Sequence, residues 1–280
     1  MSSILAVGIA TLDIVNTLEA YPQEDEEVRA LSQSRVRGGN ATNSLVVLSQ
    51  LGQDCSWAGV LPREPDAQII VDDLDGYHVD LAAVQRPRSG KLPTSYIFLS
   101  AETGSRTIVH YRDLMEYGFS AFDELDLANF EWIHFEGRNV PELGKMLKKT
   151  RQVGIPCSLE VEKPRKGIEA LFDLPDVLLF SRAWVRQRGF DLAEDFLESR
   201  SWNRPVFVAW GEAGAWCREP DGAVLHAPAP AVDVVDSLGA GDVFNAGVID
   251  GFVRKLPLQD VLNHAVRLAT GKCARKGLLI

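Results

Sequence analysis

The amino-acid sequence predicts an α/β protein with a mainly parallel sheet and helices on both faces. Two observations support this prediction: short apolar runs of strand length recur along the chain, and segments with helical spacing lie between them. Parallel strands need such crossovers, so the alternation is typical of a layered α/β fold. The length allows it, because 280 residues with 46% hydrophobic content can bury a large core.

Each predicted core strand is an apolar run that we expect to be buried on both faces. The five runs are Ile4–Ala10, Trp132–Phe135, Pro156–Leu159, Val177–Phe180 and Val206–Trp210. Helices are expected between them, over Ala41–Leu51, Glu142–Val153 and Leu192–Ser199. A glycine follows each of the first two helices, as at many helix ends.

The last part of the chain predicts one more strand and two more helices. The strand covers Val232–Val235, and the helices cover Ala240–Arg254 and Leu258–Lys272. Pro257 stands where the first turn of a helix tolerates proline. Both helices are apolar enough to pack on the sheet.

Polar and apolar residues alternate in two stretches, Glu27–Gly39 and Ser95–Arg112, which predicts half-exposed antiparallel strands. The second stretch holds a turn signal at Glu102–Ser105. We therefore expect a small sheet inserted into the core. Two interpretations stay open: an edge decoration, or a lid over an active site that also serves as a dimer surface.

Composition excludes several classes of protein. The formal net charge of −10 argues against a nucleic-acid partner, because no broad positive surface faces a phosphate backbone. The four cysteines form no Cys-x-x-Cys pair, which argues against zinc ribbons and a disulfide scaffold and favours a reducing cytoplasm. No membrane association is expected, because no apolar run approaches the roughly 20 residues of a membrane span.

Two common nucleotide-binding motifs are missing. Neither Gly144-Lys145 nor Gly271-Lys272 has the surroundings of a Walker loop. Gly239-x-Gly241 is followed by Phe244 where a dinucleotide fingerprint needs glycine. Hydride transfer is therefore disfavoured, and phosphate chemistry would need another kind of site.

The turn Gly239-Ala240-Gly241-Asp242 is the strongest candidate for such a site. It opens an apolar helix, and its small residues let backbone N–H groups approach a ligand. The first N–H groups of a helix lack partners and lie at the positive end of its dipole, so they suit a phosphoryl group that gains charge. Asp242 can take a proton from the attacking hydroxyl, and helix capping is its alternative role.

The turn resembles the C-terminal signature of the ribokinase-like (PfkB) carbohydrate kinases, and Gly38-Gly39-Asn40-Ala41-Thr42-Asn43-Ser44 resembles the N-terminal one. Two signatures in the expected order are much more specific than one. Stretches between about Ile4 and Gly277 resemble the ketohexokinase branch of that family: Tyr21-Pro22, Leu31–Gln33, Gly104–Ile108, Trp132–His134, Glu136–Asn139 and Glu160–Arg165. The resemblance implies one domain over residues 1–280, a three-layer α/β/α core with a lid from about 14–38 and 92–113.

The resemblance also implies where the sugar binds. It is expected at Asp13, Gly39, Asn40 and Asn43, and the two asparagines have helix capping as their alternative role. Asp13 follows a predicted strand, at the edge where ligands of α/β sheets bind. Arg106, on the lid, would reach the phosphates of ATP, with a solvated hairpin charge as its alternative.

The nucleotide is expected at a second glycine-bearing loop. Gly211, Glu212 and Gly214 resemble the loop that helps to hold ATP, together with Gly239 and Gly241 of the phosphate-binding turn. An ordinary β-turn is the alternative for the first three residues. The implied catalytic group is Asp242, Gly239, Ala240, Gly241 and Arg106.

The implied cofactors are ATP and Mg²⁺, and dependence on K⁺ stays open. Many relatives carry Asn-x-x-Glu near the metal, whereas this chain has Ser181-Arg182-Ala183-Trp184. Glu160 and Glu162 are candidate outer-shell partners, since Mg²⁺ usually keeps several waters. The metal ligands are therefore not predicted.

A ketohexose such as fructose is the implied acceptor, which would give fructose 1-phosphate. The alternatives are a kinase for another sugar or sugar acid and a non-catalytic sugar- or nucleotide-binding protein on the same fold. The alternating strands of the lid predict a homodimer, and the resemblance implies that Asp25 would reach the neighbour's site.

Overall fold

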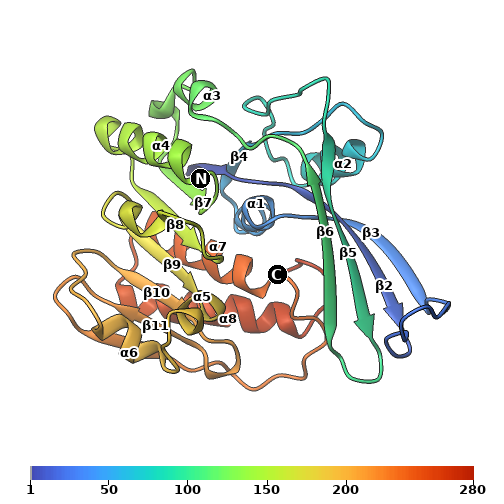
Figure 1. Ribbon diagram of the computed structural model, residues 1–280. Helices are drawn as coiled ribbons and strands as arrows, with labels where there is room; N and C mark the ends of the chain where they lie inside the picture. Colours follow the sequence, from blue (N-terminus) through green and yellow to red (C-terminus); the bar gives the residue numbers. More distant parts are fainter. Residues whose placement is uncertain (1) are drawn as a thin grey trace.

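The computed structural model describes residues 2–280 and contains two β-sheets (Figure 1). The larger sheet has eight strands in the order β12-β11-β10-β9-β8-β7-β1-β4. Six neighbouring strands are parallel: β1 (Ser3–Val7), β4 (Asp54–Ala58), β7 (Trp132–Glu136), β8 (Cys157–Val161), β9 (Val177–Ser181) and β10 (Val206–Ala209). The antiparallel strands β11 (Ala215–Arg218) and β12 (Val224–Ala227) form one edge.

Helices cover both faces of the large sheet and enclose two hydrophobic cores. One core includes α1 (Asn40–Gln50), α2 (Ala67–Gly76), α7 (Ala240–Val253) and α8 (Leu258–Cys273). The other includes α3 (Phe119–Asp123), α4 (Val140–Val153), α5 (Arg182–Gln187) and α6 (Ala193–Glu198). Alternate residues of β1 enter opposite cores, Ile4 and Ala6 the first, Leu5 and Val7 the second. The predicted three-layer α/β fold is confirmed.

Two predicted elements of the large sheet are corrected. β1 ends at Val7 rather than Ala10, because the chain turns at Gly8, where a Cβ would lie 2.5 Å from Glu136 Oε2. The strand predicted over Val232–Val235 is wrong, since these residues form an irregular segment. The nearby Pro228 and Pro230 cannot donate to a strand ladder, and Val235 N–H donates to the carbonyl of Cys273 instead, at 2.8 Å.

The smaller sheet has the order β3-β2-β5-β6 and stands beside the large one (Figure 1). Its strands are β2 (Thr11–Leu18), β3 (Ser32–Gly38), β5 (Lys91–Ser100) and β6 (Arg106–Asp113). The strand predicted over Glu27–Gly39 begins only at Ser32, which pairs with Thr17 near the end of β2. Before it, the backbone link to β2 is the hydrogen bond from Leu31 N to Thr17 O, at 2.7 Å. Asp13 was expected to follow a strand, but it lies within β2.

Other features limit the kinds of site to consider. Among residues 2–280, no helix has the length and apolar character needed to cross a membrane. All four cysteines are free, and three of them are buried. Within the same residues, no three His, Cys, Asp or Glu side chains converge into a cage for a metal ion.

Candidate active site

The two glycine signatures meet at the first turns of α1 and α7. Asn43 Nδ2 on α1 donates to Asp242 Oδ2 on α7 at 2.7 Å, although the residues are 199 positions apart in the sequence. Ser44 Oγ donates to the main-chain carbonyl of Asp242 at 3.1 Å. The side chain of Asp242 therefore binds another helix, and its capping role does not fit this geometry.

Asp242 is a buried carboxylate with unusual acid–base behaviour. Burial raises its pKa to about 7, and the negative charges of Glu162 and Glu136 act in the same direction. The hydrogen bond from Asn43 and the charge of Arg37 lower the pKa but do not outweigh burial. A group with this pKa can accept a proton near neutral pH, as a general base must.

The glycine turn before Asp242 leaves its backbone free to meet a ligand. Gly239 is the N-cap of α7 and has a left-handed φ of 80°, a conformation that other residues rarely adopt. A Cβ on Gly239 would lie 2.9 Å from Leu278 Cδ2, whereas a Cβ on Gly241 would meet nothing within 4 Å. Gly241 therefore borders open space at the positive end of the helix, together with Ala240.

A chain of polar contacts joins Asp242 to the small sheet. Arg37 on β3 donates from Nη1 to Asn43 Oδ1 at 2.6 Å and from Nε to Asp73 Oδ2 at 2.5 Å. The Arg37 side chain is only 3% exposed. Asn43 is thereby held at both ends, by Arg37 and by Asp242. The sequence analysis did not identify Arg37.

Asn40 contacts two more carboxylates at the end of β8. Its Nδ2 donates to Glu160 Oε1 at 2.9 Å and to Glu162 Oε2 at 3.2 Å, so it does not act as a cap. Burial raises the pKa of Glu160 well above its usual value, and the charge of Asp242 adds to this effect. Glu160 Oε2 is buried without a hydrogen-bond partner.

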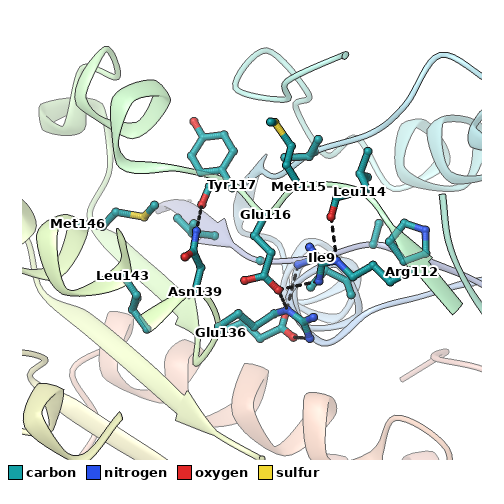
Figure 2. A pocket seen from close by; sticks show the side chains of 16 residues that line it. Ile9, Arg112, Leu114, Met115, Glu116, Tyr117, Glu136, Asn139, Leu143 and Met146 are labelled. Atoms are coloured by element: carbon teal, nitrogen blue, oxygen red, sulfur yellow. Dashed lines mark hydrogen bonds and ion pairs between the residues drawn. The ribbon is translucent and has the colours of Figure 1, made fainter. Parts of the chain in front are cut away.

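Glu136 ends β7 next to Glu160 on β8, with which it is in register. It accepts hydrogen bonds from Ile9 N at 2.9 Å and Arg138 Nη1 at 3.2 Å. Arg138 and Arg112 both bind Glu116, at 3.0 and 2.7 Å. Figure 2 shows Arg112, Glu116 and Glu136 lining a pocket whose other wall holds Leu143 and Met146. This ion-pair network connects β7 to the end of β6.

Asp13 and Gly39, which the sequence predicted as sugar-binding residues, lie where the small sheet joins α1. Asp13 Oδ1 accepts a hydrogen bond from Thr11 Oγ1 at 2.8 Å, and burial raises its pKa. Gly39 is the N-cap of α1 with a φ of 106°, and a Cβ there would lie 2.3 Å from Ile9 O. No other residue fits this position of Gly39.

The two remaining groups of candidates belong to elements other than α7. Gly211 and Glu212 belong to the short turn between β10 and β11, and Glu212 is exposed. A Cβ on Gly214 would lie 2.0 Å from Ala227 O, so close packing already requires that glycine. Arg106 is exposed at the hairpin end of β6, and no ion pair within residues 2–280 includes it.

Comparison with known proteins places this chain in a family. Residues 1–279 match the pfkB family of carbohydrate kinases. The chain belongs to that family. A ketohexokinase of Mus musculus is 38% identical over 98% of this chain and 97% of its own length. An ATP-dependent ribose-1-phosphate kinase of Halopiger xanaduensis is 25% identical over 99% and 94%.

The fold agrees with this membership. The structure of an Arabidopsis thaliana ribokinase complexed with ribose and ATP has a TM-score of 0.81 at 20% identity, and the match covers 99% of this chain and 94% of that one. The pfkB kinase described here is thus an ATP-dependent sugar kinase with a ribokinase-like fold.

Proposed function

We propose that this kinase transfers the γ-phosphoryl group of ATP to a ketohexose such as fructose, which gives fructose 1-phosphate. The observation that carries the proposal is the buried Asp242, whose pKa is raised to about 7 and which Asn43 holds beside the glycine turn. The ketose is favoured because the Mus musculus relative, at 38% identity over nearly the whole chain, is a ketohexokinase.

Each part of the site has a role in the proposed reaction. Asp13, Gly39, Asn40 and Asn43 bind the sugar hydroxyls, and Asp242 accepts the proton of the attacking hydroxyl. The new O–P bond forms as the bond from the γ-phosphorus to the oxygen of ADP breaks. The N–H groups of Gly239, Ala240 and Gly241 then stabilise the charge on the transferred phosphoryl group.

The nucleotide is proposed to lie along the Gly211–Gly214 turn, with its phosphates directed at the glycine turn of α7. Support comes from the backbone conformations of Gly211 and Gly214, with φ of 66° and 92°, which make this loop a tight turn with no side chain at either end. Arg106 is unpaired and exposed, so we propose that it reaches the phosphates when the small sheet closes as a lid.

Mg²⁺ is the proposed metal, and the residues present suit it. Glu160 and Glu162 line a small pocket with Arg138, Lys163 and Arg165, where Glu160 Oε2 and Arg165 Nε are buried without partners. Carboxylate oxygens are hard donors of the kind that Mg²⁺ binds through water. We propose that Glu160 and Glu162 hold hydrated Mg²⁺, which would neutralise charge on the ATP phosphates.

The small sheet is proposed to pair with a second copy as a homodimer. Six large apolar side chains are exposed on it or just before β3: Leu31, Val36, Tyr96, Ile108, Val109 and Tyr111. β6 is an edge strand, so its outer backbone groups are also available. A second copy would cover these surfaces, and Asp25 would then reach the neighbour's site.

A coupled ADP-release assay over ketoses, aldoses, nucleosides, sugar acids and sugar phosphates tests the acceptor. Fructose should give the highest kcat/KM, and a clear preference for another class would assign that acceptor instead.

Asp242→Asn should bind ATP almost normally but lose roughly 10²–10⁴-fold in turnover, the usual contribution of a general base. Full activity of that variant would refute the mechanism, and no turnover by the wild type on any acceptor would favour a binding protein.

A further inference from the structure

Lys272 is a fully buried cation that the proposed reaction does not use. It lies in the last turn of α8, and its side chain has 0% exposure, which no other lysine in residues 2–280 shares. Its Nζ donates to the main-chain carbonyl of Asp236 at 2.6 Å and lies 2.9 Å from Asp236 Oδ2. The ammonium therefore binds two oxygen atoms of one residue.

Asp236 stands just before the phosphate-binding turn, and its carboxylate holds the surrounding backbone. Asp236 Oδ1 accepts from Leu238 N at 2.9 Å, and Oδ2 accepts from Gly277 N at 3.0 Å. The N–H groups of Val235 and Asp236 donate to the carbonyl of Cys273, at 2.8 and 3.1 Å. The segment leading to Gly239 is thus joined to the end of α8, with the Lys272 ammonium at the junction.

A stabilising role alone explains this pair poorly. Burying the Lys272 ammonium costs free energy that its attraction to a carboxylate often does not recover, so an apolar residue there would serve stability as well or better. A main-chain carbonyl and a carboxylate facing inward are also the oxygen donors that a small cation binds. Here, the lysine supplies that cation from within the protein.

We propose that Lys272 is a built-in cation that positions the segment from Asp236 to Gly239, and hence the glycine turn that receives the phosphoryl group. It takes the place that a monovalent metal ion would otherwise need to fill at these oxygens. Lys272 is a positioning residue, since it contacts Asp236 and acts on the turn through it. Turnover should consequently be independent of K⁺.

The first test compares the wild type in K⁺, Na⁺ and choline buffers of equal ionic strength, with the best acceptor of the panel. The kcat values should agree within about twofold, because the cation site is already filled. A loss of about tenfold or more in choline, restored by K⁺, would overturn the proposal. The assay requires a wild type that turns over, so failure of the kinase assignment itself would be seen first and separately.

The second test removes the ammonium. Lys272→Ala should lower kcat about tenfold or more with little change in the acceptor KM, and propylammonium ions should restore part of the loss by filling the space. Lys276→Ala is the control, because Lys276 is exposed near the same end of the chain. A folded Lys272→Ala variant with wild-type kcat, or a loss that no alkylammonium restores, would contradict the role.

A third variant separates positioning from stability. Lys272→Met combined with Asp236→Asn removes both charges of the pair, and the free energy of unfolding should return close to that of the wild type. The kcat should stay low, because the segment before Gly239 is no longer held by a cation. Without any acceptor present, isothermal titration calorimetry should show that this double variant binds MgATP more weakly than the wild type does, while both bind adenosine equally. Unchanged binding of both ligands with unchanged kcat would refute the proposal.

Discussion

Asn43 on α1 donates a hydrogen bond of 2.7 Å to Oδ2 of Asp242 on α7. This bond favours the ionised carboxylate, whereas burial favours the protonated form and has the larger effect. The pKa of Asp242 is raised to about 7 as a result. Asn43 and burial together therefore set the pH at which the proposed base is ready to accept a proton.

A pH profile of kcat/KM tests this balance. The base must be unprotonated in the free enzyme, so kcat/KM should fall about tenfold per pH unit below the pKa of Asp242 and level off above it. Asn43→Ala removes the hydrogen bond that lowers this pKa, so the inflection should move to higher pH. Ser44→Ala is the control, because Ser44 binds the main-chain carbonyl of Asp242. An inflection that moves downward in Asn43→Ala would contradict the account.

Arg37 gives a second prediction. Arg37→Met removes the contact to Asn43 and the positive charge that lowers the pKa of Asp242. We expect turnover to fall by about tenfold, because a base displaced by a fraction of an ångström is no longer aligned with the attacking hydroxyl. We also expect the inflection of the pH profile to move to higher pH. Arg35→Met is a matched control on the same strand, because Arg35 is 43% exposed and pairs with Asp66. Equal losses in both variants would count against a specific role for Arg37.

These two arginines also show what sequence alone leaves undecided. Arg35 and Arg37 are two positions apart on β3, so they point to the same face of the small sheet. Arg37 is buried between Asp73 on α2 and Asn43 on α1, whereas Arg35 pairs only with the partly exposed Asp66 at the start of α2. That packing depends on residues distant in the chain, such as Asp73, and α2 itself was not predicted.

Other parts of the site follow directly from the sequence. The two glycine signatures predicted that Asn43 and Asp242 belong to one site, and the structure brings them into contact. Glu136 and Glu160 end apolar strands, and neighbouring parallel strands bring such ends together, so their meeting was open to prediction. β11 and β12 were missed, because antiparallel strands of four residues give no apolar run of useful length.

The proposed dimer surface can be tested with one charge. Val109 lies on the edge strand β6 with 56% exposure, so Val109→Glu should place a carboxylate in an apolar interface. Sedimentation should show a dimer for the wild type and a weakened dimer for the variant. Val153→Glu, at a 47% exposed position on α4, should leave the dimer intact. A monomeric wild type would refute the interface.

The last prediction concerns stability. The pKa of Asp242 is higher in the folded chain than its usual 3.8, so folding favours the protonated acid, and stability declines as pH rises between 3.8 and about 7. Asp242→Asn removes this penalty. The shift sets a ceiling of about 4 kcal/mol, and we expect the free energy of unfolding at pH 8 to rise by about 1–2 kcal/mol, with a smaller gain toward pH 4.

Asp250 on the same helix provides the opposite case. Although burial raises its pKa, hydrogen bonds from His264 and Gln53 outweigh it, so the net pKa is lowered and the ionised form stabilises the fold above its usual pKa. Asp250→Asn should therefore destabilise the protein at pH 8, where Asp242→Asn stabilises it. Urea unfolding of both variants at pH 5 and pH 8 measures the two signs. Destabilisation by Asp242→Asn at pH 8 would contradict this account. It would mean that the buried surroundings do not disfavour the ionised form of Asp242.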